Sequence, residues 1–388
     1  MLVITIIVMI ILAAAIILSL SNNGIIGKAD KAKIDSDTAS LKEYVNTLRA
    51  EYELMTADER NRKTFEAYAN AKLEENGYKG AAIDVDGKVH SNLTESAKTA
   101  IKAGIKVGDK VEGYILTEKS YTTSGEENDG IKQTLKTDTS VTWKYIGIGE
   151  DGNLEIVADI SATEISKSAA EYKISLLATG GPTEETGTSK KTLTLSGKGG
   201  YLNGPAELDK ACATLYSVDG KGTAKSMNID HVTRILGYTG EKGSYLDADG
   251  NYVKTAEAMT IGEIEKKLGT ELRYRTTPDG KDISTYKSDC YYINKTSDVS
   301  KMQNAGNVGL VYGSTEYWLA SPCVQADFSN KCTEFYMRYV QLEGVGRFAM
   351  FKSFNYWDKF SCAIRPVVSL ASNIQIENGR NVGTWVIK

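Results

Sequence analysis

The chain opens with an almost uninterrupted apolar stretch. In residues 1–20 (MLVITIIVMIILAAAIILSL) the polar side chains are those of Thr5 and Ser19, and the first charge is that of Lys28. Twenty helical residues span about 30 Å, the thickness of a hydrocarbon core. Backbone polar groups have to be paired inside lipid, so the pattern predicts a helix. A removable signal peptide needs a basic residue ahead of the apolar run, and none is present. A plain membrane anchor stays an alternative.

A narrower apolar stripe follows. From Ile34 to Met55, apolar or aromatic residues recur at spacings of 7, 4, 3, 4 and 3 residues, and Thr38 occupies the remaining heptad position. Such a stripe predicts an amphipathic helix over 29–55 that packs on something. Residues 21–28, with Gly24 and Gly27, are expected to be a joint between the two helices. The expected packing residues are Ile34, Leu41, Val45, Leu48, Tyr52 and Met55.

Downstream, the pattern changes to short elements. Residues 56–78 predict a further helix that ends at Gly77. Residues 141–158 predict a β-hairpin with its turn at 150–153. The polar stretch 171–192 is expected to be a loop or linker.

The C-terminal part shows three helix start signals before a β-rich, aromatic end. Pro205 opens a short helix that ends near Tyr216. Asn228 caps 229–236, and Thr260 with Glu263 forms a capping box. The expected fold class is α+β, a long N-terminal hydrophobic and amphipathic helix followed by a large β-rich head with short helices. The expected domains are 1–55, 56–170 and 193–388, with 171–192 as the linker.

Composition excludes several functions. The 388 residues carry 46 Lys+Arg and 50 Asp+Glu, a net charge of −4. The chain therefore lacks the excess of positive charge that is typical of nucleic-acid-binding proteins. Two histidines argue against a multi-histidine metal site. The 36 glycines and 22 tyrosines favour a turn-rich extracellular protein.

The N-terminal residues resemble a known family. Residues 2–33 (LVITIIVMIILAAAIILSLSNNGIIGKADKAK) are similar to the start of the type IV pilin-like proteins of Gram-positive, clostridia-type bacteria. This resemblance implies a leader removed by a prepilin peptidase and a retained helix that becomes the core of a filament. Pilins typically carry a glutamate in the first turn of this helix. No acidic residue precedes Asp30 here, so the glutamate-dependent assembly step is not carried over.

Assembly has a physical rationale in the apolar stretch. Burying twenty apolar residues among copies of the chain is worth tens of kcal/mol before entropy, at about 25 cal/mol per Å². Head-to-tail contacts that do not close into a ring generate a helical filament. The expected self-assembly residues are Leu2, Val3, Ile4, Ile6, Ile7, Val8, Ile10, Ile11, Leu12, Ala13, Ala14, Ala15, Ile16, Ile17 and Leu18.

A second resemblance lies in the C-terminal half. The segments GYLNGPAELDKACATLY, AKSMNIDHVTRILGY, YWLASPCV and AIRPVVSL are similar, in this order, to the heads of related clostridial pilin-like proteins. The last two also resemble, more loosely, folds of the C-type lectin and formylglycine-generating-enzyme kind. In such a fold Trp318 fills the core and Arg365 holds a loop, so both are expected to be structural.

The five cysteines bear on the compartment. Cys323 and Cys332 flank a polar loop, which predicts a disulfide across a hairpin outside the cell. The pairing of Cys212, Cys290 and Cys362 stays open, as does the reduced alternative.

Candidate chemistry is sparse. Asp247, Asp249 and Asn251 alternate like the start of a calcium loop, but the turn glycine and a twelfth-position glutamate do not follow. A polar turn is therefore expected there. His231 follows Asp230 with no nucleophile nearby in sequence, so a surface or satisfied histidine is expected. We assign no catalytic residue, no metal and no cofactor, and expect no enzyme.

The leading hypothesis is a pilin, a structural subunit of an extracellular type IV pilus-like filament whose head is exposed for adhesion. Its expected partners are copies of itself, the prepilin peptidase and assembly machinery in the cytoplasmic membrane, and host or surface ligands, with no nucleic acid. The alternative is a minor pilin, a pseudopilin or a membrane-anchored lectin-like binding protein. A membrane-anchored enzyme is the third hypothesis.

Overall fold

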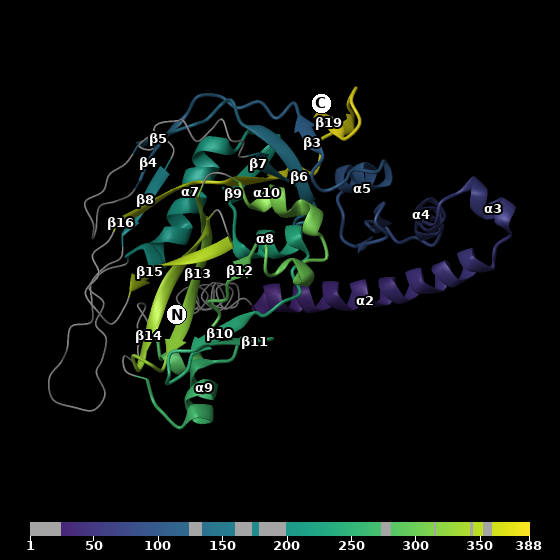
Figure 1. Ribbon diagram of the computed structural model, residues 1–388. Helices are drawn as coiled ribbons and strands as arrows, with labels where there is room; N and C mark the ends of the chain where they lie inside the picture. The colour runs from purple at the N-terminus through teal and green to yellow at the C-terminus, as the bar shows by residue number, and fades with distance from the viewer. Residues whose placement is uncertain are drawn as a thin grey trace, which may run out of the picture. The chain divides into compact units, whose positions relative to one another are not determined.

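The chain divides into two compact units in a computed structural model (Figure 1). Unit 1 comprises the chain up to Ile105 together with 148–153, and unit 2 comprises 106–147 and 154–388. The structure describes residues 25–123, 134–159, 173–177, 199–272, 281–313, 316–341, 344–351 and 359–388.

The predicted fold class needs correction. The described residues are α+β, but none of their helices is long and apolar enough to cross a membrane. Their first helix, α2 (Ile25–Leu54), has 30 residues and carries charged residues along its length. A long apolar N-terminal helix is therefore wrong for the described part of the chain. The predicted apolar residues 1–20, and Gly24 of the predicted joint, lie outside it, whereas Gly27 lies within α2.

Unit 1 is built on one face of α2. Leu41, Val45 and Leu48 are buried there with Phe65 and Leu73 of α4. The stripe therefore has its partner inside its own unit. The elements of unit 1 are α2, α3 (Ala57–Arg62), α4 (Phe65–Glu75), β1 (Ala82–Ile83), β2 (Val89–His90) and α5 (Glu95–Lys102).

The helix predicted over 56–78 is two helices. Thr64 is extended (φ −66°, ψ 161°), and its hydroxyl accepts from the backbone N–H of Ala67 at 3.3 Å. A threonine side chain competes in this way with the helical backbone, so α4 begins anew after it. The prediction of a single helix over 56–78 is therefore wrong.

Unit 2 contains two large sheets in its described part. One has the order β18-β19-β3-β6-β7-β17-β9. The other has β11-β10-β13-β14-β15-β12, and β16 joins β13 to β8. Their strands are β3 (Lys110–Glu112), β6 (Thr142–Ile148), β7 (Leu154–Asp159), β8 (Lys173–Leu177), β9 (Gly222–Ser226), β10 (Gly243–Leu246), β11 (Tyr252–Thr255), β12 (Ile293–Asn294), β13 (Tyr317–Asp327), β14 (Cys332–Gln341), β15 (Gly344–Phe351), β16 (Lys359–Ala363), β17 (Pro366–Leu370), β18 (Ile376–Asn378) and β19 (Thr384–Ile387).

Short helices complete unit 2. One core gathers α8 and α10 with residues of both sheets, among them Val157, Leu319 and Val367. A second core gathers α9 with β13 and β14. The remaining elements are η2 (Gly199–Asn203), α7 (Gly204–Tyr216), α8 (Ile229–Leu236), α9 (Ile261–Leu268), η3 (Ile283–Thr285), η4 (Val299–Lys301), η5 (Ala305–Asn307), α10 (Val308–Val311), β4 (Ser120–Thr122) and β5 (Thr134–Lys136).

Several local predictions are confirmed. Asn228 caps α8, and Thr260 forms a capping box with Glu263 at α9. The hairpin predicted over 141–158 is β6 and β7. The domain boundaries differ from the expected ones, because 56–170 is divided between both units. Within the expected linker, 173–177 form β8, which pairs with β16.

The tip of the β6–β7 hairpin belongs to unit 1. Its Gly152 carbonyl accepts from the backbone N–H of Thr94, the N-cap of α5, at 3.1 Å. Gly152 has φ +75°, and a Cβ built there would lie 1.9 Å from the carbonyl oxygen of Asn92. The tip therefore requires glycine for two separate reasons, its backbone conformation and its close contact.

Gly152→Ala should destabilise unit 1 by more than about 1 kcal/mol, since alanine is strained at this φ and also clashes. Gly77→Ala is the matched control, because Gly77 has φ +76° and nothing within 4 Å of a built Cβ. Urea unfolding followed by helical circular dichroism measures both variants. Equal losses in the two would show that the contact with Asn92 contributes nothing.

Candidate functional site

The predicted self-assembly residues, 2–4, 6–8 and 10–18, lie outside the described residues, and so does the side chain of Ile34. The rest of the packing stripe is described. Leu41, Val45 and Leu48 are buried, and the Tyr52 hydroxyl donates to the Lys63 carbonyl at 2.6 Å. Met55 is half-buried just after α2.

The disulfide of unit 2 joins Cys290 to Cys323, which are 33 residues apart. The predicted Cys323–Cys332 pairing is therefore wrong. The reason is the position of the segment 288–290, which hydrogen-bonds along β13: Asp289 donates its N–H to the Val324 carbonyl at 3.0 Å. This places Cys290 beside Cys323. Cys332 is a buried thiol on β14, and Cys212 is another on α7.

Closing a 33-residue loop in the unfolded chain costs about 3–4 kcal/mol of entropy in the chain-entropy model. We therefore expect Cys323→Ser to lower the free energy of unfolding of unit 2 by about that much. Dithiothreitol should cause a similar loss in the unsubstituted protein and little further loss in the variant. Trp143, Trp318 and Trp385 lie in unit 2 and the sequence of unit 1 contains no tryptophan, so tryptophan fluorescence during urea unfolding measures the effect. A variant as stable as the oxidised protein would contradict this expectation.

Trp318 and Arg365 lie in the interior of unit 2. Trp318 is fully buried on β13, with Tyr339 in an edge contact at 6.1 Å. The Arg365 guanidinium donates to the carbonyls of Ala158 at 3.2 Å and Val311 at 3.1 Å. It also donates to the Tyr317 hydroxyl at 2.9 Å. Arg365 thus connects β7, α10 and β13.

Glu155 of β7 is the centre of a buried charged network. Its carboxylate is 1% exposed and accepts from Arg234, while Lys225 Nζ lies 3.0 Å away. His231 Nε2 lies 3.7 Å away. Burial alone would raise the pKa of Glu155, but His231 and the Arg234 charge outweigh burial and hold this pKa well below its usual range.

His231 has a structural position in this network. Its Nδ1 accepts from the backbone N–H of Asn228 at 3.0 Å, which makes the histidine the second half of the α8 capping box. Nε2 therefore carries the proton of the neutral ring and faces Glu155. Burial lowers the pKa of His231, although Glu155 partly opposes this shift. The expectation of a satisfied histidine agrees with these contacts.

The pKa of His231 predicts how stability depends on pH. The unfolded histidine titrates near about 6.5, and the folded one at a lower pH, so the unfolded state binds more protons between the two values. Stability should therefore fall as pH falls below about 6.5. His231→Gln keeps a cap acceptor but does not titrate, so tryptophan-monitored urea unfolding should show a shallower loss of stability on the acid side. His90→Gln, in unit 1, should leave the steeper loss unchanged. Equal slopes for His231→Gln and the unsubstituted protein would contradict this role for His231.

The Asp247 loop is a polar turn. Asp247 Oδ1 accepts from the backbone N–H groups of Asp249 at 3.0 Å and Asn251 at 2.8 Å. The carboxylate thus serves the turn itself, as expected for an Asx-type turn.

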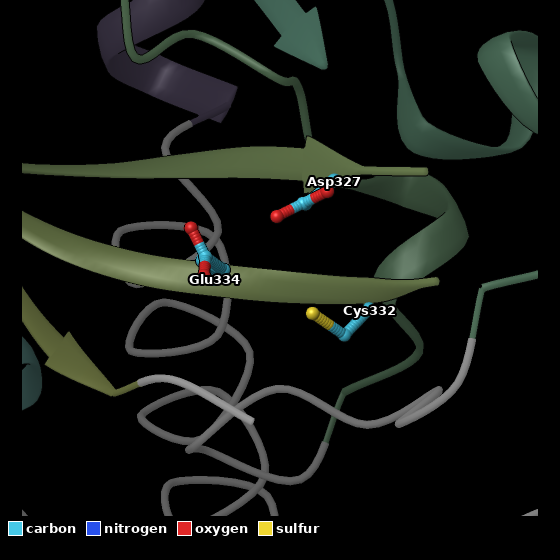
Figure 2. A group of neighbouring side chains, drawn as sticks. All are labelled: Asp327, Cys332 and Glu334. Atoms are coloured by element: carbon cyan, nitrogen blue, oxygen red, sulfur yellow. The ribbon is translucent and has the colours of Figure 1, made fainter. Parts of the chain in front are cut away.

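The structure also brings together three metal-ligating side chains that the sequence did not predict as a site. Asp327, Cys332 and Glu334 are all buried, and one ligand atom of each lies within 4.8 Å of the others. Figure 2 shows them at the end of the β13–β14 hairpin, Asp327 on one strand and the other two on the next. The sequence contains no spacing that marks such a group, because the cross-strand register creates it.

Comparisons with protein-family models, curated proteins and solved structures found no match for this chain. Both resemblances therefore stay predictions.

Proposed function

We propose that this chain is a structural subunit of an extracellular type IV pilus-like filament. The observation that carries the proposal is the apolar stretch of residues 1–20, which has no charged side chain and is separated from α2 by residues 21–24. In water such a stretch exposes far more apolar surface than a single soluble molecule tolerates. Burial against the same stretch of other copies removes this surface from water.

The packing of α2 supports assembly through residues 1–20 rather than through the apolar stripe of α2. The apolar stripe of α2 is buried against α4, and the chain between these helices carries many charges. Association through the stripe would require unit 1 to open. The apolar stretch ahead of α2 is therefore the surface that the proposal assigns to assembly.

The disulfide supports a location outside the cytoplasm. Disulfides persist in oxidising compartments and are rare where thiol reductants are abundant. The Cys290–Cys323 bond is 2% exposed or less at both cysteines, so it belongs to the core of unit 2. A head that is assembled outside the cell is consistent with this bond.

The decisive experiment is electron cryo-microscopy of material sheared from the native cells. Filaments whose density follows this chain would support the proposal. If the protein stays in the membrane fraction and no filament contains it, the proposal is wrong, and an anchored binding protein becomes the better account.

Ile11→Asp should abolish filaments, because one buried, unpaired carboxylate in an apolar interface costs several kcal/mol in every subunit. Ala14→Lys should have the same effect. Leu54→Asp is the matched control, since Leu54 is 88% exposed at the end of α2 and should leave filaments intact. A non-reducing gel that detects the Cys290–Cys323 bond checks that the head has folded in each variant. Normal filaments from Ile11→Asp would rule out assembly through this stretch.

A further inference from the structure

The β13–β14 hairpin has a buried polar face. The register pairs Asp327 with Cys332 and Gln325 with Glu334. Residues directly opposite each other, and those two apart along a strand, share one face of a sheet. These four side chains therefore form a compact group on one face, and each is 5% exposed or less.

Two carboxylates in this group lack a charge partner. Among the described residues, no lysine, arginine or histidine forms an ion pair with Asp327 or Glu334. Asp327 accepts from Ser329 Oγ at 2.6 Å and from the side-chain amide of Asn330 at 2.7 Å, and Glu334 accepts from the Tyr336 hydroxyl. These neutral donors satisfy carboxyl oxygens, but they bring no positive charge to two buried acidic groups that lie close together.

Besides the two acidic residues, Gln325 is a second, independent observation that points to a bound ligand. Its side chain is fully buried, and neither its amide oxygen nor its amide nitrogen has a hydrogen-bond partner among the described residues. A buried amide without partners costs about 1–3 kcal/mol. Gln325 lies directly opposite Glu334, so both side chains project from the face of the hairpin that carries the acidic group.

We propose that Asp327, Cys332, Glu334 and Gln325 bind one divalent transition-metal ion of the zinc type. A cation would neutralise the two carboxylates and would give the Gln325 oxygen its missing partner. The thiol selects against Ca²⁺ and Mg²⁺, which take oxygen ligands only. Binding replaces the proton on the Cys332 sulfur, which is released to solvent, with a metal–sulfur bond.

The geometry is close to that of a coordinated ion. Bonds of 2.0–2.3 Å in a tetrahedron place ligand atoms about 3.3–3.8 Å apart. The ligand atoms of Asp327, Cys332 and Glu334 lie within 4.8 Å of one another. A contraction of at most about 1.5 Å, through rotation of these side chains, would bring them to the separations of a coordinated ion. Four protein ligands leave no open position, so the site would be structural and would stabilise the hairpin in unit 2.

The test uses the full-length protein, stripped with a chelator, incubated with zinc chloride and desalted. Metal analysis should find one zinc ion per chain, and zinc should raise the melting temperature. Cys332→Ser and Glu334→Gln should each lose the zinc and the thermal shift. Cys212→Ser, which removes another buried thiol of unit 2, should retain both.

Two further measurements test the metal site without the Cys332→Ser variant, which is needed if that variant folds poorly. Cobalt(II) added to the unsubstituted protein should give a thiolate-to-metal charge-transfer absorption, which oxygen ligands alone do not produce. Gln325→Glu adds a third buried carboxylate, so it should lower the melting temperature without metal and enlarge the shift caused by zinc. No bound zinc, equal zinc in Cys332→Ser, or a cobalt spectrum without the thiolate band would each overturn the proposal. None of these results depends on filament formation.

Discussion

The guanidinium group of Arg365 lies where three elements of unit 2 meet, and it donates to carbonyls on β7 and α10 and to the hydroxyl of Tyr317 on β13. Arg365 is only 2% exposed, so each donor that lost its acceptor would be left unpaired in the interior. Because β7 belongs to one large sheet and β13 to the other, this one side chain links the two sheets by hydrogen bonds. The α8–α10 core packs around the same junction.

Features that depend on a few neighbouring residues were predictable from the sequence. The caps at Asn228 and Thr260 and the β6–β7 hairpin each follow from a local pattern. Features that depend on distant partners were not. Cys290 meets Cys323 only because 288–290 hydrogen-bonds along β13, and nothing in the spacing of the cysteines indicates this. The acidic group at Asp327 arises from the β13–β14 register in the same way.

The N-terminal region shows a different limit of sequence reasoning. Hydropathy identified the apolar stretch, and periodicity identified the stripe of α2, but neither indicated which partner each would have. In the structure the stripe is satisfied within unit 1, by α4 and the β1–β2 pair. The C-terminal half of α2 is thus stabilised by tertiary packing, as is usual for helices in folded proteins.

The division of the hairpin between two units has a mechanical consequence. The chain passes from one unit to the other after Ile105, after Gly147 and after Asn153. Tension that enters at the N-terminal end therefore has one covalent route into unit 2, through residues 105–106, and one non-covalent route, through the hydrogen bond between Thr94 and Gly152 of the hairpin tip. Unravelling unit 1 under load has to break the Thr94–Gly152 attachment as well.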